Sequence, residues 1–103
     1  MDILTTGKMV KYEFMMIVDP TISEEERTNK IEAVKIVLDK AGAKITNEDV
    51  WGDKKLAYKI NKQDIAFYVL YTLELDGTKI KEISTEINLN RSIWRYMFTK
   101  IED

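Results

Sequence analysis

One segment of the chain, residues 51–60, has the residue types that bind nucleic acid. It reads Trp-Gly-Asp-Lys-Lys-Leu-Ala-Tyr-Lys-Ile, so that lysines and aromatic rings interleave. Lysines neutralise phosphates without sequence preference, and a Tyr or Trp ring can stack on an unpaired base. The competing interpretation is a solvated edge strand whose lysines prevent pairing with other chains. Composition alone slightly favours the edge strand, because the net charge of −2 lacks the positive field of an independent nucleic-acid binder.

Other kinds of chemistry find little support in the sequence. The chain has no Cys and no His, which removes disulfides, thiolate and imidazole metal ligands and the usual general base. The spacing of Asp and Glu matches no calcium loop, and no glycine-rich loop is present to cradle a phosphate. The acidic run Glu24–Glu26 suits the first turn of a helix, whose dipole it complements. We therefore predict a protein without enzymatic activity, cofactor, metal or small-molecule substrate.

Length and composition indicate one domain. A chain of 103 residues with 45% hydrophobic and 33% charged residues can build a core without disulfides or metal. No apolar run approaches the roughly 18 to 20 residues that span a bilayer, so we expect a cytoplasmic protein without membrane contact. Residues 1–8 show no periodicity and are predicted to be a disordered N-terminal extension, with Met9 as an alternative start. The folded domain is predicted to cover residues 9–103.

Hydrophobic periodicity predicts the elements of the first half of this domain. Apolar residues at every even position predict a strand over 10–18. Ser23, followed three residues later by Glu26, forms a capping-box signature that opens a helix, and Gly42 is placed to end it. A long, bent strand is predicted over 43–60.

The second half continues with two strands and a helix. Strict alternation predicts a strand over 65–75, joined to the preceding strand through residues 61–64 as a hairpin. A turn at 76–78 leads into a second helix with Ile80, Ile83 and Ile87 on one face. The last strand is predicted over 93–101.

The element order β-α-β-β-α-β predicts an α+β protein with the ferredoxin-like split βαβ fold. Both helices are expected on one face of a four-stranded antiparallel sheet, with the strands over 10–18 and 65–75 in the centre. Met15, Ile17, Tyr68 and Leu70 then point away from the helices. Uncovered apolar groups of this size usually mark an interface.

The lysine segment also resembles the signature of the bacterial small ribosomal subunit protein six family, Gly-x-Lys/Arg-x-Leu-Ala/Ser-Tyr-x-Ile. The matching positions here are Gly52, Lys54, Leu56, Ala57, Tyr58 and Ile60. The resemblance extends over about residues 9–100. The family's opening strand and turn are matched by Lys11-Tyr12-Glu13 and Asp19-Pro20, and its closing strand is matched by Asn90, Ile93, Arg95 and Met97. Lysines replace the arginines often found in the signature, which keeps the charge but loses bidentate geometry.

The resemblance implies a structural constituent of the small ribosomal subunit. Members bind the central domain of the small-subunit ribosomal RNA, at the platform, jointly with small-subunit protein eighteen. A basic partner would explain why the chain itself need not be positively charged. The residues that the resemblance implies for RNA binding are Lys11, Tyr12, Lys54, Lys55, Tyr58 and Arg95, to which we add Arg91 for its position near the same end. Contacts to the partner protein are expected at Trp51, Tyr68 and Leu70.

Two other functions are compatible with the same topology, because a fold alone does not determine function. One is a small-molecule-sensing or homo-oligomeric regulatory module, which would need a ligand loop rich in Gly or convergent polar residues. The four glycines here are scattered. The other is an acyl or phosphoryl hydrolase, which would need a phosphate-binding loop after the first strand. Residues 19–22 offer no backbone cradle of that kind.

Overall fold

The computed structural model describes residues 9–101. In chain order the elements are β1 (Met9–Val18), α1 (Glu24–Lys40), β2 (Lys44–Ile60), β3 (Gln63–Asp76), a 3-10 turn at Gly77–Lys79, α2 (Ile80–Ile87) and β4 (Ile93–Lys100). The predicted β-α-β-β-α-β order is confirmed, with most boundaries within one or two residues. The predicted extension over residues 1–8 lies outside the described residues, as do residues 102 and 103.

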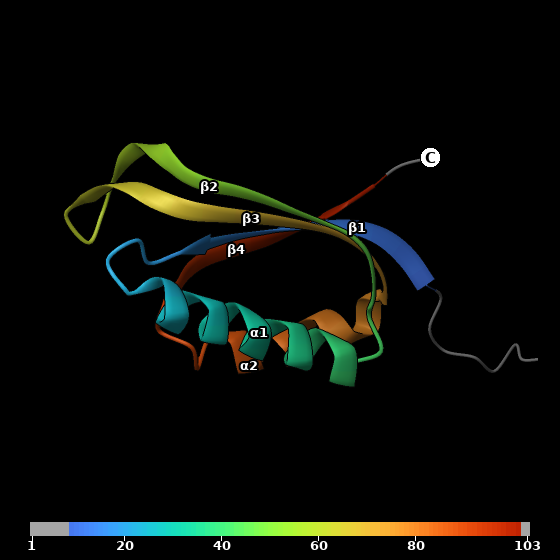
Figure 1. The fold of residues 1–103 in the computed structure, drawn as a ribbon. Helices are drawn as coiled ribbons and strands as arrows, with labels where there is room; N and C mark the ends of the chain where they lie inside the picture. The colour runs from blue at the N-terminus through green and yellow to red at the C-terminus, as the bar shows by residue number, and fades with distance from the viewer. Residues whose placement is uncertain (1–8, 102–103) are drawn as a thin grey trace, which may run out of the picture.

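The four strands form one sheet in the order β2-β3-β1-β4, with β1 antiparallel to both neighbours and β2 antiparallel to β3. Both helices lie against the same face of this sheet (Figure 1). The two central strands are β1 and β3, as predicted. The sheet therefore has one face covered by helices and one face that no described element covers, which we call the helix-free face.

The first helix begins and ends as its sequence signals indicate. The Ser23 hydroxyl accepts a hydrogen bond from the Glu26 backbone N–H at 3.1 Å. At the other end Gly42 has φ of 86°, the Ala43 N–H donates to the Leu38 carbonyl at 3.0 Å, and the Gly42 N–H donates to the Asp39 carbonyl at 3.0 Å. This pair of bonds is a Schellman motif, which needs a left-handed residue where Gly42 stands.

The core lies between the sheet and the helices. Its fully buried side chains come from alternate positions of β1 and β3 and from one stripe of each helix. They are Phe14, Met16, Val18, Val34, Leu38, Val69, Tyr71, Leu73, Leu75, Ile83 and Ile87. Apolar burial of this extent is the main force that holds the two layers together.

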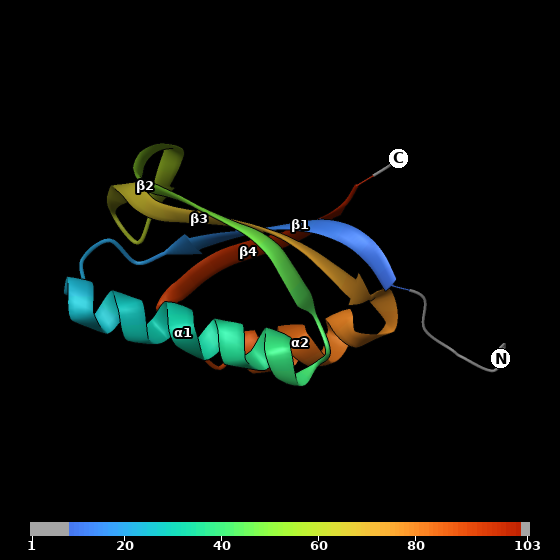
Figure 2. The same ribbon diagram turned by 45° about the vertical axis from the view of Figure 1, so that its right-hand side comes forward.

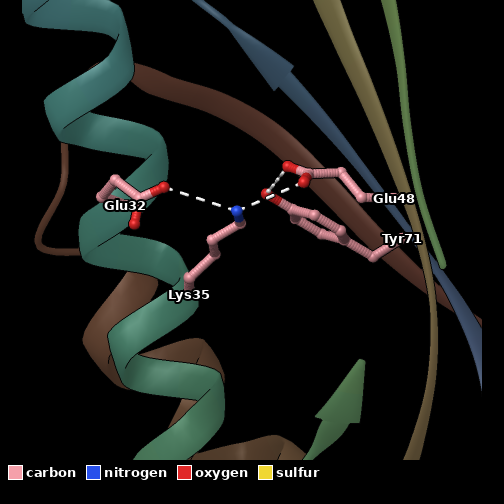
Figure 3. A network of polar contacts seen from close by, with 4 residues as sticks. All are labelled: Glu32, Lys35, Glu48 and Tyr71. Atoms are coloured by element: carbon pink, nitrogen blue, oxygen red, sulfur yellow. Dashed lines mark hydrogen bonds and ion pairs between the residues drawn. The ribbon is translucent and has the colours of Figure 1, made fainter. Parts of the chain in front are cut away.

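A polar network ties α1 to the outer strand β2. The ammonium of Lys35 contacts Glu32 at 3.4 Å and Glu48 of β2 at 3.2 Å, and the Tyr71 hydroxyl donates to the other Glu48 oxygen at 3.1 Å (Figure 3). Burial raises the pKa of the Tyr71 hydroxyl well above its usual value, and the charge of Glu48 raises it further. Burial lowers the pKa of Lys35, but the contacts with Glu48 and Glu32 outweigh this, so that its pKa is raised.

The β2–β3 hairpin differs from the prediction at its turn. Ile60 pairs with Gln63, so the turn has two residues, Asn61 and Lys62, with φ of 48° and 68°. Two successive positive φ values match a type I′ turn, whose twist suits a hairpin. Strand β3 therefore starts at Gln63, whereas alternation predicts a start at residue 65, because polar residues beside a tight turn carry no apolar signal. Strand β2 has a bulge at Gly52, where φ is 80° and the register shifts between residues 50 and 52.

Candidate functional site

The helix-free face carries a continuous group of apolar side chains across the sheet. Met15 pairs with Leu70 of β3 and with Met97 of β4, and the neighbouring row pairs Ile17 with Tyr68 and with Arg95. Directly paired residues project from the same face of a sheet. Met97 is 61% exposed, whereas Met15, Ile17, Tyr68 and Leu70 are half-buried. This apolar group matches the one predicted from alternation; Met97 extends it onto β4, where Arg95 borders it.

Trp51 and Tyr68 form an aromatic pair beside this group. Their rings stack with centroids 6.3 Å apart and planes 8° from parallel, and the Trp51 indole N–H donates to Asp49 at 3.0 Å. The bulge at Gly52 shifts the register of β2 by one residue, so that Gly52 stands opposite Tyr68. Trp51 remains 41% exposed. Two of the three residues predicted to contact a partner, Trp51 and Tyr68, thus pack against each other on the helix-free face.

An open groove of about 540 Å³ runs along this aromatic pair. Its lining residues are Asp49, Val50, Trp51, Lys54, Lys55 and Tyr68. Lys54 and Lys55 are exposed, and within residues 9–101 neither forms an ion pair. Two predicted RNA contacts and two predicted partner contacts therefore share one groove.

A second, smaller hollow of about 250 Å³ lies at the β1–β4 side and is lined by Met15, Ile17, Arg95, Tyr96 and Met97. Its surface is almost entirely apolar, with the Arg95 guanidinium as its charged group. Arg95 is exposed and lies in the same row as Tyr68, with Ile17 between them. The apolar group thus separates two cationic borders, Arg95 on β4 and the lysines on β2.

The remaining predicted RNA contacts are more dispersed. Arg91 is exposed in the loop after α2, which is tied to the end of β1 by a hydrogen bond from the Asp19 N–H to the Ser92 carbonyl at 2.8 Å. Arg91 therefore lies toward the same end of the sheet as Lys54 and Arg95. Tyr58 is 66% exposed near the end of the β2–β3 hairpin.

Two predicted contacts lie apart from the others. Lys11 is exposed on the helix-free face but near the opposite end of β1, paired with Glu74. Tyr12 lies on the helix-covered face, half-buried, with its ring edge-on to Phe98 at 6.2 Å. A Cβ added at Gly77 would meet the Tyr12 hydroxyl at 2.7 Å, which shows how closely this side chain packs on the turn before α2. The structure therefore gives Tyr12 a packing role, and its contact with RNA stays a prediction.

Sequence reasoning missed two features, one on each face of the sheet. Met97 belongs to a motif of the resemblance, but the sequence analysis does not predict its exposure, although its odd position on β4 places it on the face opposite the half-buried Tyr96 and Phe98. The second is Arg27 of α1, whose guanidinium lies 4.0 Å from the centre of the Phe67 ring on the helix-covered face. No spacing rule links residues 40 positions apart, so this cation–π contact had no sequence signal.

In the described part of the chain no three His, Cys, Asp or Glu residues are grouped so that they could hold a metal ion. The pKa of Asp76 is lowered because its carboxylate accepts hydrogen bonds from the backbone and hydroxyl of Thr78, an arrangement that caps the 3-10 turn. Between residues 9 and 101 the helices are too short or too polar to cross a membrane.

Comparison with known proteins gives one consistent answer. The family model described as "Ribosomal protein S6" matches residues 11–100. The small ribosomal subunit protein bS6 of Fusobacterium nucleatum is 44% identical over 92 residues, which cover 89% of this chain and 98% of that protein. The protein of the same name from Thermoanaerobacter pseudethanolicus is 36% identical over 95 residues, covering 92% of this chain and all of that protein.

Solved structures agree with this at the level of the fold. The crystal structure of 30S ribosomal protein S6 from Thermotoga maritima superimposes with a TM-score of 0.85 at 29% identity, covering 91% of this chain and 89% of that one. The C-terminal domain of the MgtC protein from Mycobacterium tuberculosis reaches a TM-score of 0.61 at 12% identity, covering 91% of this chain and 89% of that domain, and shares the fold alone. Because the match in sequence and in fold spans almost the whole described domain, this chain belongs to the ribosomal protein S6 family, structural and non-enzymatic proteins of the small ribosomal subunit.

Proposed function

We propose that this protein binds the central domain of the small-subunit ribosomal RNA, at the platform, as a heterodimer with small-subunit protein eighteen. The observation that supports this most directly is the helix-free face, where an apolar group lies between Arg95 and the lysines of β2. Such a surface suits a joint interface, with a protein over its apolar centre and RNA phosphates at its borders. As a member of its family the protein is cytoplasmic and ribosome-associated.

The RNA contacts are assigned mainly to one end of the sheet. Lys54, Lys55, Arg91 and Arg95 would contact phosphates, which position a protein on RNA without specifying sequence. Tyr58, at the hairpin end, would add an aromatic contact. Lys11 and Tyr12 are assigned to a second, separate contact, and the assignment of Tyr12 rests on the family resemblance alone.

The partner contact is assigned to Trp51, Tyr68 and Leu70, extended by Met15 and Met97. A stacked aromatic pair beside exposed apolar side chains is typical of residues that dominate binding energy in protein interfaces. A basic partner on this face would also supply the positive charge that a chain with net charge −2 lacks. Joint binding thus accounts for both the uncovered apolar face and the acidic composition.

A salt titration of binding to a central-domain RNA fragment, with and without small-subunit protein eighteen, tests the proposal. We expect tight binding only when the partner is present. Tight binding by this protein alone would support RNA binding but contradict the idea that a basic partner must supply the positive charge. Binding in neither condition would contradict the proposal and favour a ferredoxin-like regulatory module.

A further inference from the structure

Near its turn, the β2–β3 hairpin departs from regular strand pairing. Lys55 pairs with Ile65, and the next pair toward the turn is Ile60 with Gln63. Residues 56–59 of β2 therefore lie opposite only residue 64 of β3. This segment, which we call the hairpin bulge, lies beyond the ends of β1 and β4 (Figures 1 and 2).

The hairpin bulge is anchored on one side chain and presents others to solvent. Leu56 is only 8% exposed, whereas Tyr58 is 66% exposed and Ala57 and Lys59 are also exposed. A bulge redirects side chains that a regular ladder would place on alternate faces. Here it buries the Leu56 side chain and turns the Tyr58 ring outward.

Tyr58 differs from the other four tyrosines of the chain. Each of those has a partner: Tyr12 contacts Phe98, Tyr68 stacks on Trp51, and Tyr71 and Tyr96 donate hydrogen bonds to Glu48 and Asn88. Among residues 9–101, the Tyr58 ring contacts no other aromatic ring and its hydroxyl makes no hydrogen bond. The fold therefore leaves both the ring face and the hydroxyl of Tyr58 free for another molecule.

The charge around Tyr58 indicates what that molecule is. Residues 53–65 contain four lysines and two aspartates, in a chain whose net charge is −2. One of the lysines, Lys62, occupies a left-handed turn position with φ of 68°, which favours Gly or Asn over Lys. A positively charged hairpin end with a free aromatic ring fits a nucleotide, whose phosphate and base need these two kinds of group.

We propose that the hairpin bulge binds a single unpaired nucleotide of the RNA, with the base stacked on Tyr58 and the flanking phosphates on Lys59 and Lys62. This inference rests on the proposed function and specifies the kind of RNA that it involves. Duplex RNA offers no accessible base face to Tyr58, since its bases are stacked within the helix. The target must therefore contain an extruded or single-stranded base beside the surface contacted by the helix-free face.

The test compares Tyr58→Phe, Tyr58→Leu and Tyr58→Ala in the full chain with small-subunit protein eighteen. The probe is the central-domain RNA fragment with 2-aminopurine replacing unpaired adenines one at a time. We expect Tyr58→Phe to keep nearly full affinity. Tyr58→Leu and Tyr58→Ala should lose about 5- to 150-fold in affinity, the range for one base stacked on an aromatic ring. At one position the wild type should quench the 2-aminopurine fluorescence, and Tyr58→Leu should not.

Lysine variants separate charge from stacking. Lys59→Ala and Lys62→Ala should each reduce the salt dependence of binding by nearly one phosphate. Tyr58→Leu should leave it unchanged, as should the control Lys81→Ala on α2. A Tyr58→Leu variant that binds as tightly as the wild type overturns the inference while leaving the proposed function intact. Weaker affinity of that variant for the partner protein without RNA also overturns it, because Tyr58 would then be a protein contact. Failure of the wild type to bind RNA overturns both.

Discussion

The two faces of the central strands carry similar side chains but differ in what covers them. On β1, Phe14 and Met16 are fully buried beneath the helices, whereas Met15 and Ile17, one residue away in each case, are only half-buried on the helix-free face. The fold of this chain needs only the first pair. An apolar side chain that its own fold leaves uncovered is better explained by a partner than by stability.

Substitutions on the two faces should differ in their effect on the free energy of unfolding. The largest is expected for Leu73→Ala on the helix-covered face, where the side chain is fully buried in the core. Truncation of a buried Leu removes apolar contacts and leaves a cavity, which costs about 2 to 5 kcal/mol. Urea denaturation measures this loss. A loss below about 1 kcal/mol would mean that this face does not hold the core.

The next effect concerns the polar network at the edge of the core. Tyr71→Phe removes the hydrogen bond to Glu48 but keeps the buried ring, so we expect a loss of about 1 kcal/mol at neutral pH. The pKa of Tyr71 is raised in the folded state. Its stabilising effect is therefore complete below the unfolded pKa of about 10 and is lost as the pH rises above it, because the unfolded state then releases the proton.

Urea denaturation of both proteins from pH 7 to pH 11 measures this difference. The advantage of the wild type over Tyr71→Phe should fall above pH 10 by at most about 1.4 kcal/mol per pH unit. The raised pKa of Lys35 also lowers the free energy of unfolding as the pH rises. Because Lys35 is present in both proteins, the difference between them reports on Tyr71. An advantage that stays constant to pH 11 would contradict the assigned shift.

A smaller effect on stability is expected for Leu70→Ala, three residues from Leu73 on the same strand but on the helix-free face. Because Leu70 is half-buried and no described element covers it, the loss should stay below about 1 kcal/mol. The affinity for small-subunit protein eighteen should instead fall about tenfold or more, as for an interface hot spot. Calorimetric titration measures that affinity. Unchanged binding would remove Leu70 from the partner surface.

The contrast between the two faces could be predicted from the sequence because it depends on alternation alone. The capping box at Ser23, the stop at Gly42 and the central position of β1 and β3 also have local signals, and the structure confirms each of them. Features that depend on register could not be predicted in this way. The alternation of apolar residues does not indicate how many residues a bulge contains. The structure alone therefore shows that Trp51 stacks on Tyr68 and that the four residues 56–59 lie opposite residue 64.

The smallest effect on the free energy of unfolding is expected for the lysines of β2 that border the helix-free face. Lys54→Ala and Lys55→Ala remove exposed side chains without ion pairs in the described part of the chain, so unfolding should change by no more than about 0.5 kcal/mol. In the joint RNA-binding assay each should instead reduce the salt dependence of binding by nearly one phosphate, while Lys81→Ala on α2 should not. If all three variants showed the salt dependence of the wild type, Lys54 and Lys55 would contact no phosphate. Their role would then be to prevent the edge strand β2 from pairing with other chains. A reduced dependence for Lys54→Ala and Lys55→Ala alone would instead place RNA at the border of the same groove that holds Trp51 and Tyr68.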